Sequence, residues 1–148
     1  MSYLRFAAMI VTSTIVMFAL MYVNTYQLDH VFFSATRAYM ALVMAGAMTI
    51  VMLAFMLGMY RSAGLNVAIF IVGGLLIGFG IYFVRSQTLI GEVAYMRAMI
   101  PHHSIAILTS ERAAIREPRV RKLADQIIET QKREIAEMEQ LIRELDNR

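Results

Sequence analysis

Charge is so unevenly distributed along this chain that its two parts cannot share one environment. Residues 1–84 contain only four acidic or basic side chains, Arg5, Asp29, Arg37 and Arg61, whereas residues 85–148 hold eleven Lys or Arg and ten Asp or Glu. Long apolar stretches with almost no charge are typical of membrane-spanning segments. The sequence therefore predicts a membrane domain over residues 1–86 and a water-exposed domain over residues 87–148.

Three apolar runs in the first part are long enough to cross a lipid bilayer, at residues 6–23, 38–60 and 65–84. A signal peptide is the alternative for the first run, but Arg5 is the only early positive charge and no small-residue cleavage pattern follows. Three spans place the connection 24–37 and the C-terminal domain on one side of the membrane. All three histidines, His30, His102 and His103, then share one compartment.

The second part is expected to form two helices, over residues 88–115 and from Pro118 onward, because a proline suits the first position of a helix. In the second helix apolar residues recur at spacings of three and four, including Val120, Leu123, Ile127, Ile135, Met138 and Leu141. Two such helices form an antiparallel hairpin with little core. We expect this all-α chain to complete a bundle by pairing with another copy, as a homodimer or higher oligomer, or with its own membrane part.

The start of the hairpin concentrates sulfur and imidazole in the run Tyr95-Met96-Arg97-Ala98-Met99-Ile100-Pro101-His102-His103. On a helix, Met96, Met99 and His103 fall within about 60° of one another, with His102 about 60° to the side. Thioether and neutral imidazole together suit copper, and Cu(I) best. Glu92 extends this face by one turn, so it is a candidate carboxylate to orient an imidazole ring or to join the metal ligands. The alternative is that these residues only pack in a core.

Pro101 lies inside this run, where a proline removes one helical hydrogen bond. The sequence leaves two outcomes open, a kinked helix or a new helix that starts at Pro101.

The second span carries a methionine at every fourth position, Met40, Met44, Met48, Met52 and Met56. They form a slowly winding stripe that is either packing or a path for metal. In the third span Gly74-x-x-x-Gly78 would permit close approach of another helix.

Several classes of function find no support in the sequence. The absence of cysteine excludes disulfides, thiolate metal sites and cysteine catalysis. The net charge of +3 is small, and basic residues alternate with acidic ones, so we expect no nucleic-acid partner. Neither histidine of the pair has a glutamate three residues before it, as a di-iron site requires, and no catalytic motif is present. We expect no enzyme.

The C-terminal part resembles the family known as domain of unknown function 305, ferritin-like helical proteins found mostly in bacteria. The resemblance covers about residues 90–145 and rests on Met96-x-x-Met99-Ile100-Pro101-His102-His103 and on Gln131-x-x-Glu134-Ile135-x-x-Met138. Members are exported or membrane-attached, and some bind copper. The resemblance implies that Met99, His102, His103 and Met138 are copper ligands, with Met96 as a further candidate. It also implies a bacterial cytoplasmic membrane with the hairpin outside the cytoplasm.

A weaker likeness links the membrane part to the Ctr copper transporters, which have three spans, Met-x-x-x-Met and Gly-x-x-x-Gly. This chain lacks their methionine-rich N-terminal tail.

These observations predict a membrane-anchored protein that sequesters copper or exchanges it with a donor or acceptor protein. His30 and Asp29 are additional candidates, as an imidazole and its supporting carboxylate, and the sequence leaves open whether His30 joins the site of His102 and His103. The alternatives are a Cu(I) permease lined by Met40, Met44, Met48 and Met52, and a structural assembly protein without metal.

Overall fold

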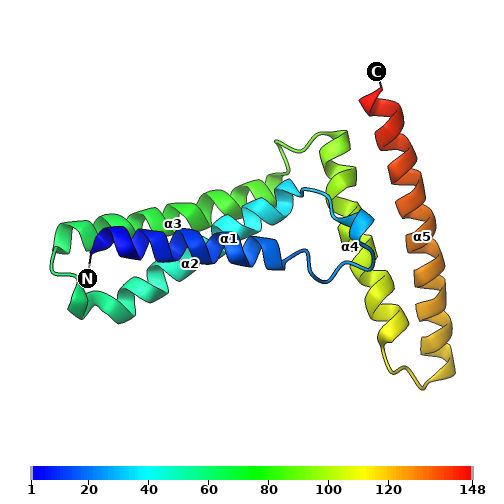
Figure 1. Cartoon of the computed structure of the whole chain (residues 1–148), viewed down its shortest axis with the longest axis horizontal. Coiled ribbons are helices and arrows are strands. Elements are labelled where there is room, and N and C mark those ends of the chain that lie inside the picture. Colours follow the sequence, from blue (N-terminus) through cyan, green and yellow to red (C-terminus); the bar gives the residue numbers. More distant parts are fainter. Residues whose placement is uncertain (1, 148) are drawn as a thin grey trace. The chain divides into compact units, whose positions relative to one another are not determined.

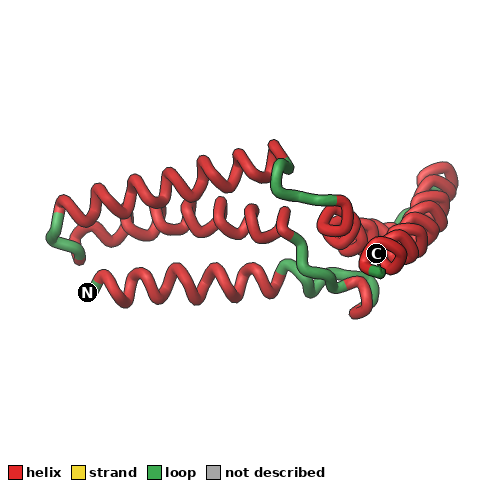
Figure 2. Tube along the Cα trace, turned by 90° about the horizontal axis from the view of Figure 1, so that it is seen from above, coloured by secondary structure: helices red, strands yellow, loops and turns green. Residues whose placement is uncertain are grey.

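The computed structural model describes residues 2–147 and is built from helices, with no strand in that range (Figure 2). Five α-helices follow one another along the chain (Figure 1): α1 (Tyr3–Leu20), α2 (Ala35–Met56), α3 (Ala63–Ser86), α4 (Glu92–Arg112) and α5 (Pro118–Asp146). Short 3₁₀ turns at Leu28–His30 (η1) and Leu57–Met59 (η2) lie beside α2 in sequence. The predicted all-α class, with three long apolar helices before a two-helix region, is confirmed.

The chain divides into two compact units, which we describe separately. Unit 1 comprises residues 1–21 and 36–89 and contains α1, α2 and α3, whereas unit 2 comprises residues 22–35 and 90–148. The connection 22–35 groups with α4 and α5 and not with the apolar helices that flank it in sequence.

The three helices of unit 1 are long and apolar enough to cross a membrane. Their ends differ by a few residues from the predicted spans because local caps set them. The Ser2 side chain accepts a hydrogen bond from the Leu4 amide at the start of α1, and Ser62 does the same for Leu65 at the start of α3.

Packing inside unit 1 depends on glycines at the crossing of α2 and α3. A Cβ atom at Gly46 would lie 2.5 Å from the Gly73 carbonyl oxygen, and one at Gly80 would lie 3.0 Å from the Tyr39 carbonyl oxygen. Such close backbone approach is possible only without side chains. Gly74 and Gly78, the pair that the sequence singled out, have open space where a Cβ would stand. The close approach within this chain therefore uses other glycines.

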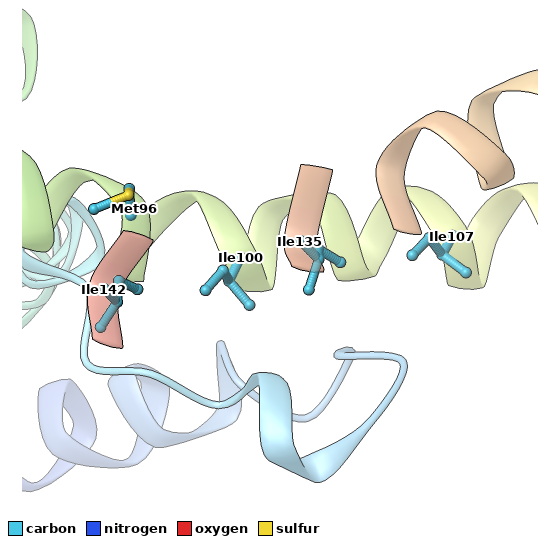
Figure 3. Packing of buried hydrophobic residues seen from close by; sticks show 5 residues of the cluster. All are labelled: Met96, Ile100, Ile107, Ile135 and Ile142. Atoms are coloured by element: carbon cyan, nitrogen blue, oxygen red, sulfur yellow. The ribbon is translucent and has the colours of Figure 1, made fainter. Parts of the chain in front are cut away.

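Unit 2 is a hairpin in which α4 and α5 are joined by the turn 113–117 (Figure 1). α4 is shorter than the predicted 88–115, because Gly91 is its N-cap and Ala113 is already extended. The helix continues through Pro101, which is buried, so no new helix begins there. Figure 3 shows the hairpin core, to which α4 contributes Met96, Ile100 and Ile107 and α5 contributes Ile135 and Ile142.

Candidate metal-binding groove

An open groove of about 750 Å³ runs between the first half of α4 and the second half of α5. Three methionines, one histidine and three glutamates are among the residues that line it, which are Ile90, Gly91, Glu92, Tyr95, Met96, Met99, His103, Glu134, Glu137, Met138, Leu141 and Leu145. The hairpin thus brings Met138 of α5 to the same groove as the predicted α4 face. Both helices are needed to form the site.

The α4 residues reach the groove because they recur at spacings of three and four on one side of the helix. Met96 is only 7 % exposed and belongs to the hairpin core, so its thioether lies at the floor of the groove. Met99 and Met138 are half-buried. The predicted face of Met96, Met99, His103 and Glu92 is therefore present as one surface.

His103 is held through both ring nitrogens. Its Nδ1 lies 3.0 Å from the Met99 carbonyl oxygen, and its Nε2 lies 2.8 Å from Oε2 of Glu134. Gln131 also donates to Oε2 of Glu134, at 3.4 Å. Because the carbonyl and the carboxylate both accept, the ring makes both bonds together only when each nitrogen carries a proton.

This arrangement fits the requirements of a metal ligand. The Met99 carbonyl selects the tautomer with the proton on Nδ1, which leaves the Nε2 lone pair available. Glu134 has a side chain that is 41 % exposed and can rotate into solvent when Nε2 binds another group. The bond to Glu134 fixes the orientation of the imidazole.

Glu134 is the partner of His103 that sequence reasoning did not assign. The sequence offered Glu92 as the supporting carboxylate because it lies on the α4 face, and the structure places Glu92 in the groove lining but gives His103 a bond to Glu134. The available signal was Gln131-x-x-Glu134-x-x-x-Met138, where Glu134 lies one helical turn before a candidate ligand on the same face.

His102 lies outside the groove lining and is exposed. Its ring centroid is 6.3 Å from that of His103, and the ring planes are inclined at 69°. Adjacent residues on an α-helix point about 100° apart, so the two imidazoles of this pair diverge.

His30 is buried in unit 2, but its ring makes a hydrogen bond outside the groove. Its Nδ1 lies 3.0 Å from Oγ of Ser104, which also accepts a hydrogen bond of 2.7 Å from the Tyr26 amide. Ser104 is fully buried on α4. Asp29, the proposed carboxylate partner, is exposed, and the bond of the His30 ring goes to Ser104. The role of His30 in this structure is to fix the connection 22–35 on α4.

Replacing Ser104 with alanine should loosen that connection. The Tyr26 amide and the His30 ring would lose their shared partner, and an unpaired buried polar group costs about 1–3 kcal/mol. We expect faster amide hydrogen exchange at Tyr26 and His30, whereas Ser110→Ala on the same helix should leave both rates unchanged. Equal exchange in the two variants would contradict this role of Ser104.

Some methionines of the α2 stripe pack inside unit 1, and others are exposed. Met52 packs against the buried cluster of Phe6, Leu53 and Tyr60. Met48 is half-buried, whereas Met40 and Met44 are 41 % and 36 % exposed. The stripe winds around α2 as predicted from its spacing, so its members have different surroundings.

Among residues 2–147, no three His, Asp or Glu side chains come together as a metal-binding group. The other soft donors in the groove lining are the thioethers of Met96, Met99 and Met138.

Comparisons with known proteins place the hairpin in a family. Residues 92–148 match the family described as "Domain of unknown function (DUF305)". The chain is also 35 % identical over 114 residues to a protein of Acanthamoeba polyphaga mimivirus named "Uncharacterized protein L153", a match that covers 74 % of this chain and 73 % of that protein. No solved structure matches. The likeness to Ctr transporters finds no support in these matches, whereas the C-terminal resemblance is confirmed: the chain belongs to the DUF305 family.

Proposed function

We propose that this chain is a membrane-anchored copper-binding protein that holds Cu(I) in the groove between α4 and α5. The observation that carries the proposal is the convergence of three thioethers and one imidazole from two helices on one groove. Thioether and imidazole are the protein ligands that best suit Cu(I), and the chain has no cysteine to offer a thiolate.

The three apolar helices of unit 1 would anchor the hairpin at the membrane. The proposal locates the hairpin outside the cytoplasm of a bacterial cell, as the family resemblance implies. Copper would be cargo, sequestered in the groove or exchanged with a donor or acceptor protein. The permease alternative is less favoured, because Met52 of the stripe packs in the membrane unit.

A Cu(I) titration against a competing chelator tests the proposal on the full chain in detergent. The variant Met99→Leu/Met138→Leu should bind Cu(I) at least tenfold more weakly than the parent, which corresponds to about 1.4 kcal/mol. Leucine keeps the apolar volume of methionine and removes the sulfur, so the core should survive. The matched control is Met56→Leu/Met59→Leu, which removes two thioethers outside the groove.

The histidine pair gives a second comparison within the same experiment. His103→Ala should weaken binding, whereas His102→Ala should have little effect, because only His103 lines the groove. Equal affinity in the groove variant and its matched control would overturn the groove as the site. If the parent and all variants bind Cu(I) equally weakly, the chain is not a copper-binding protein, and a structural assembly protein becomes the favoured function.

A further inference from the structure

One side of the hairpin exposes apolar side chains toward both of its ends. Tyr95, Val120, Leu123, Ile127 and Leu141 are exposed by 54 %, 48 %, 55 %, 36 % and 40 % respectively. On α5 the members are separated by three, four and fourteen residues, so they share one side of that helix. We call this surface the open face.

The open face reaches two grooves, and the polar residues Gln131 and Glu134 lie between its apolar members on α5. The metal-binding groove lies toward the end of α5, and a second groove of about 240 Å³, lined in part by Ile115, Val120, Leu123 and Ile127, lies near the turn that joins the helices. Other parts of the hairpin are covered by the connection 22–35, where Tyr26 and Phe32 pack against its core. The apolar stripe of α5 is thus wider than the surface that packs in the hairpin core.

The charges of α5 indicate what could cover the open face. Residues 118–133 carry five basic and two acidic side chains, whereas residues 134–146 carry one basic and five acidic side chains. A second α5 lying antiparallel on the first would place each basic half against an acidic half. The parallel arrangement would place like charges together, which is unfavourable.

We propose that a second copy of this chain covers the open face, with the two α5 helices antiparallel and Gln131 near the two-fold axis. Gln131 lies midway between Val120 and Leu141, so a two-fold axis there brings Val120 of one copy to Leu141 of the other. Leu123 of the second copy would then lie over the groove that contains Met99, His103 and Met138. The metal site is open in one chain and would be closed by the other.

The link to the metal rests on the proposed function, whereas the pairing itself does not. Closing the groove with apolar side chains would exclude water from a thioether site. The basic half of the second α5 would also lie beside Glu134 and Glu137, which line the groove.

Single cysteines introduced into this cysteine-free chain test the pairing in membranes. With a short thiol-specific cross-linker, Gln131→Cys should give covalent dimers. A mixture of Val120→Cys and Leu141→Cys chains should cross-link to each other, whereas Leu141→Cys alone should not. Glu129→Cys, exposed on the opposite side of the same helix, is the matched control and should remain monomeric.

Cross-linking of Gln131→Cys no greater than that of Glu129→Cys would overturn the proposal. Efficient cross-linking of Leu141→Cys to itself would overturn the antiparallel arrangement. The variant Leu123→Asp tests the consequence for the site: it should abolish the Gln131→Cys dimer and weaken Cu(I) binding severalfold. Leu123 lies outside the metal-binding groove of its own chain and is exposed, so the hairpin should still fold.

The two proposals fail in different ways. Dimers without Cu(I) binding would refute the proposed function and leave the pairing standing. Cu(I) binding that is tight in the parent and unchanged in Leu123→Asp would refute closure of the site by a second copy.

Discussion

Replacing Ile100 with alanine should destabilise the hairpin by about 2–5 kcal/mol, because it removes a fully buried side chain and leaves a cavity. Ile100 lies in the hairpin core, together with Ile107 and Ile135 (Figure 3). A two-helix unit has few other buried residues to compensate. The loss is therefore a large fraction of the stability of the unit, since even ordinary domains are stable by only about 5–15 kcal/mol.

Amide hydrogen exchange across α4 and α5, measured on the full chain in detergent, would report this change as a general loss of protection. The control is Leu28→Ala in η1, since Leu28 is 88 % exposed and its removal leaves no cavity. Protection that is equal in the two variants would show that the core of Figure 3 does not hold the hairpin together.

Replacing Gly46 with alanine should separate α2 from α3 in unit 1. The new Cβ would lie 2.5 Å from the Gly73 carbonyl oxygen and 2.8 Å from Cγ1 of Ile77. The first of these neighbours is backbone and cannot rotate away, so the helices must move apart. Overpacking of this kind costs about 1–3 kcal/mol.

Thermal unfolding in detergent, followed by circular dichroism, measures the effect of Gly46→Ala. Gly74→Ala is the matched control, because its Cβ meets nothing within 4 Å and alanine favours the helix. We expect a lower melting temperature for Gly46→Ala and an unchanged or higher one for Gly74→Ala. The reverse order would mean that the helices cross at the Gly74-x-x-x-Gly78 pair.

Much of the candidate groove could be predicted from spacing alone. Met96, Met99 and His103 share one face of α4 wherever that helix lies in the fold. The period of 3.6 residues per turn fixes the angles between their side chains around the helix axis. The same periodicity separates His102 from His103, although the resemblance to the family treats the pair together. The contribution of Met138 was predicted only through that resemblance, since it lies on another helix.

The rest of the site depends on how the helices pair. No pattern within α4 indicates that His103 should bond to Glu134, because the two residues are 31 positions apart and meet only across the hairpin. The sequence left open whether His30 joins the other histidines, and burial against Ser104 gives it a separate role in fixing the connection 22–35.

The sequence by itself determined the helical class, the three membrane-length segments and the turn before Pro118, because hydropathy, charge and proline geometry act within a few residues of chain. Only the tertiary structure decided which glycines support the crossing of α2 and α3, which carboxylate holds His103, and which side of α5 remains open. Those features are contacts between segments distant in sequence, and they follow from the relative rotation of packed helices, which local periodicity does not specify.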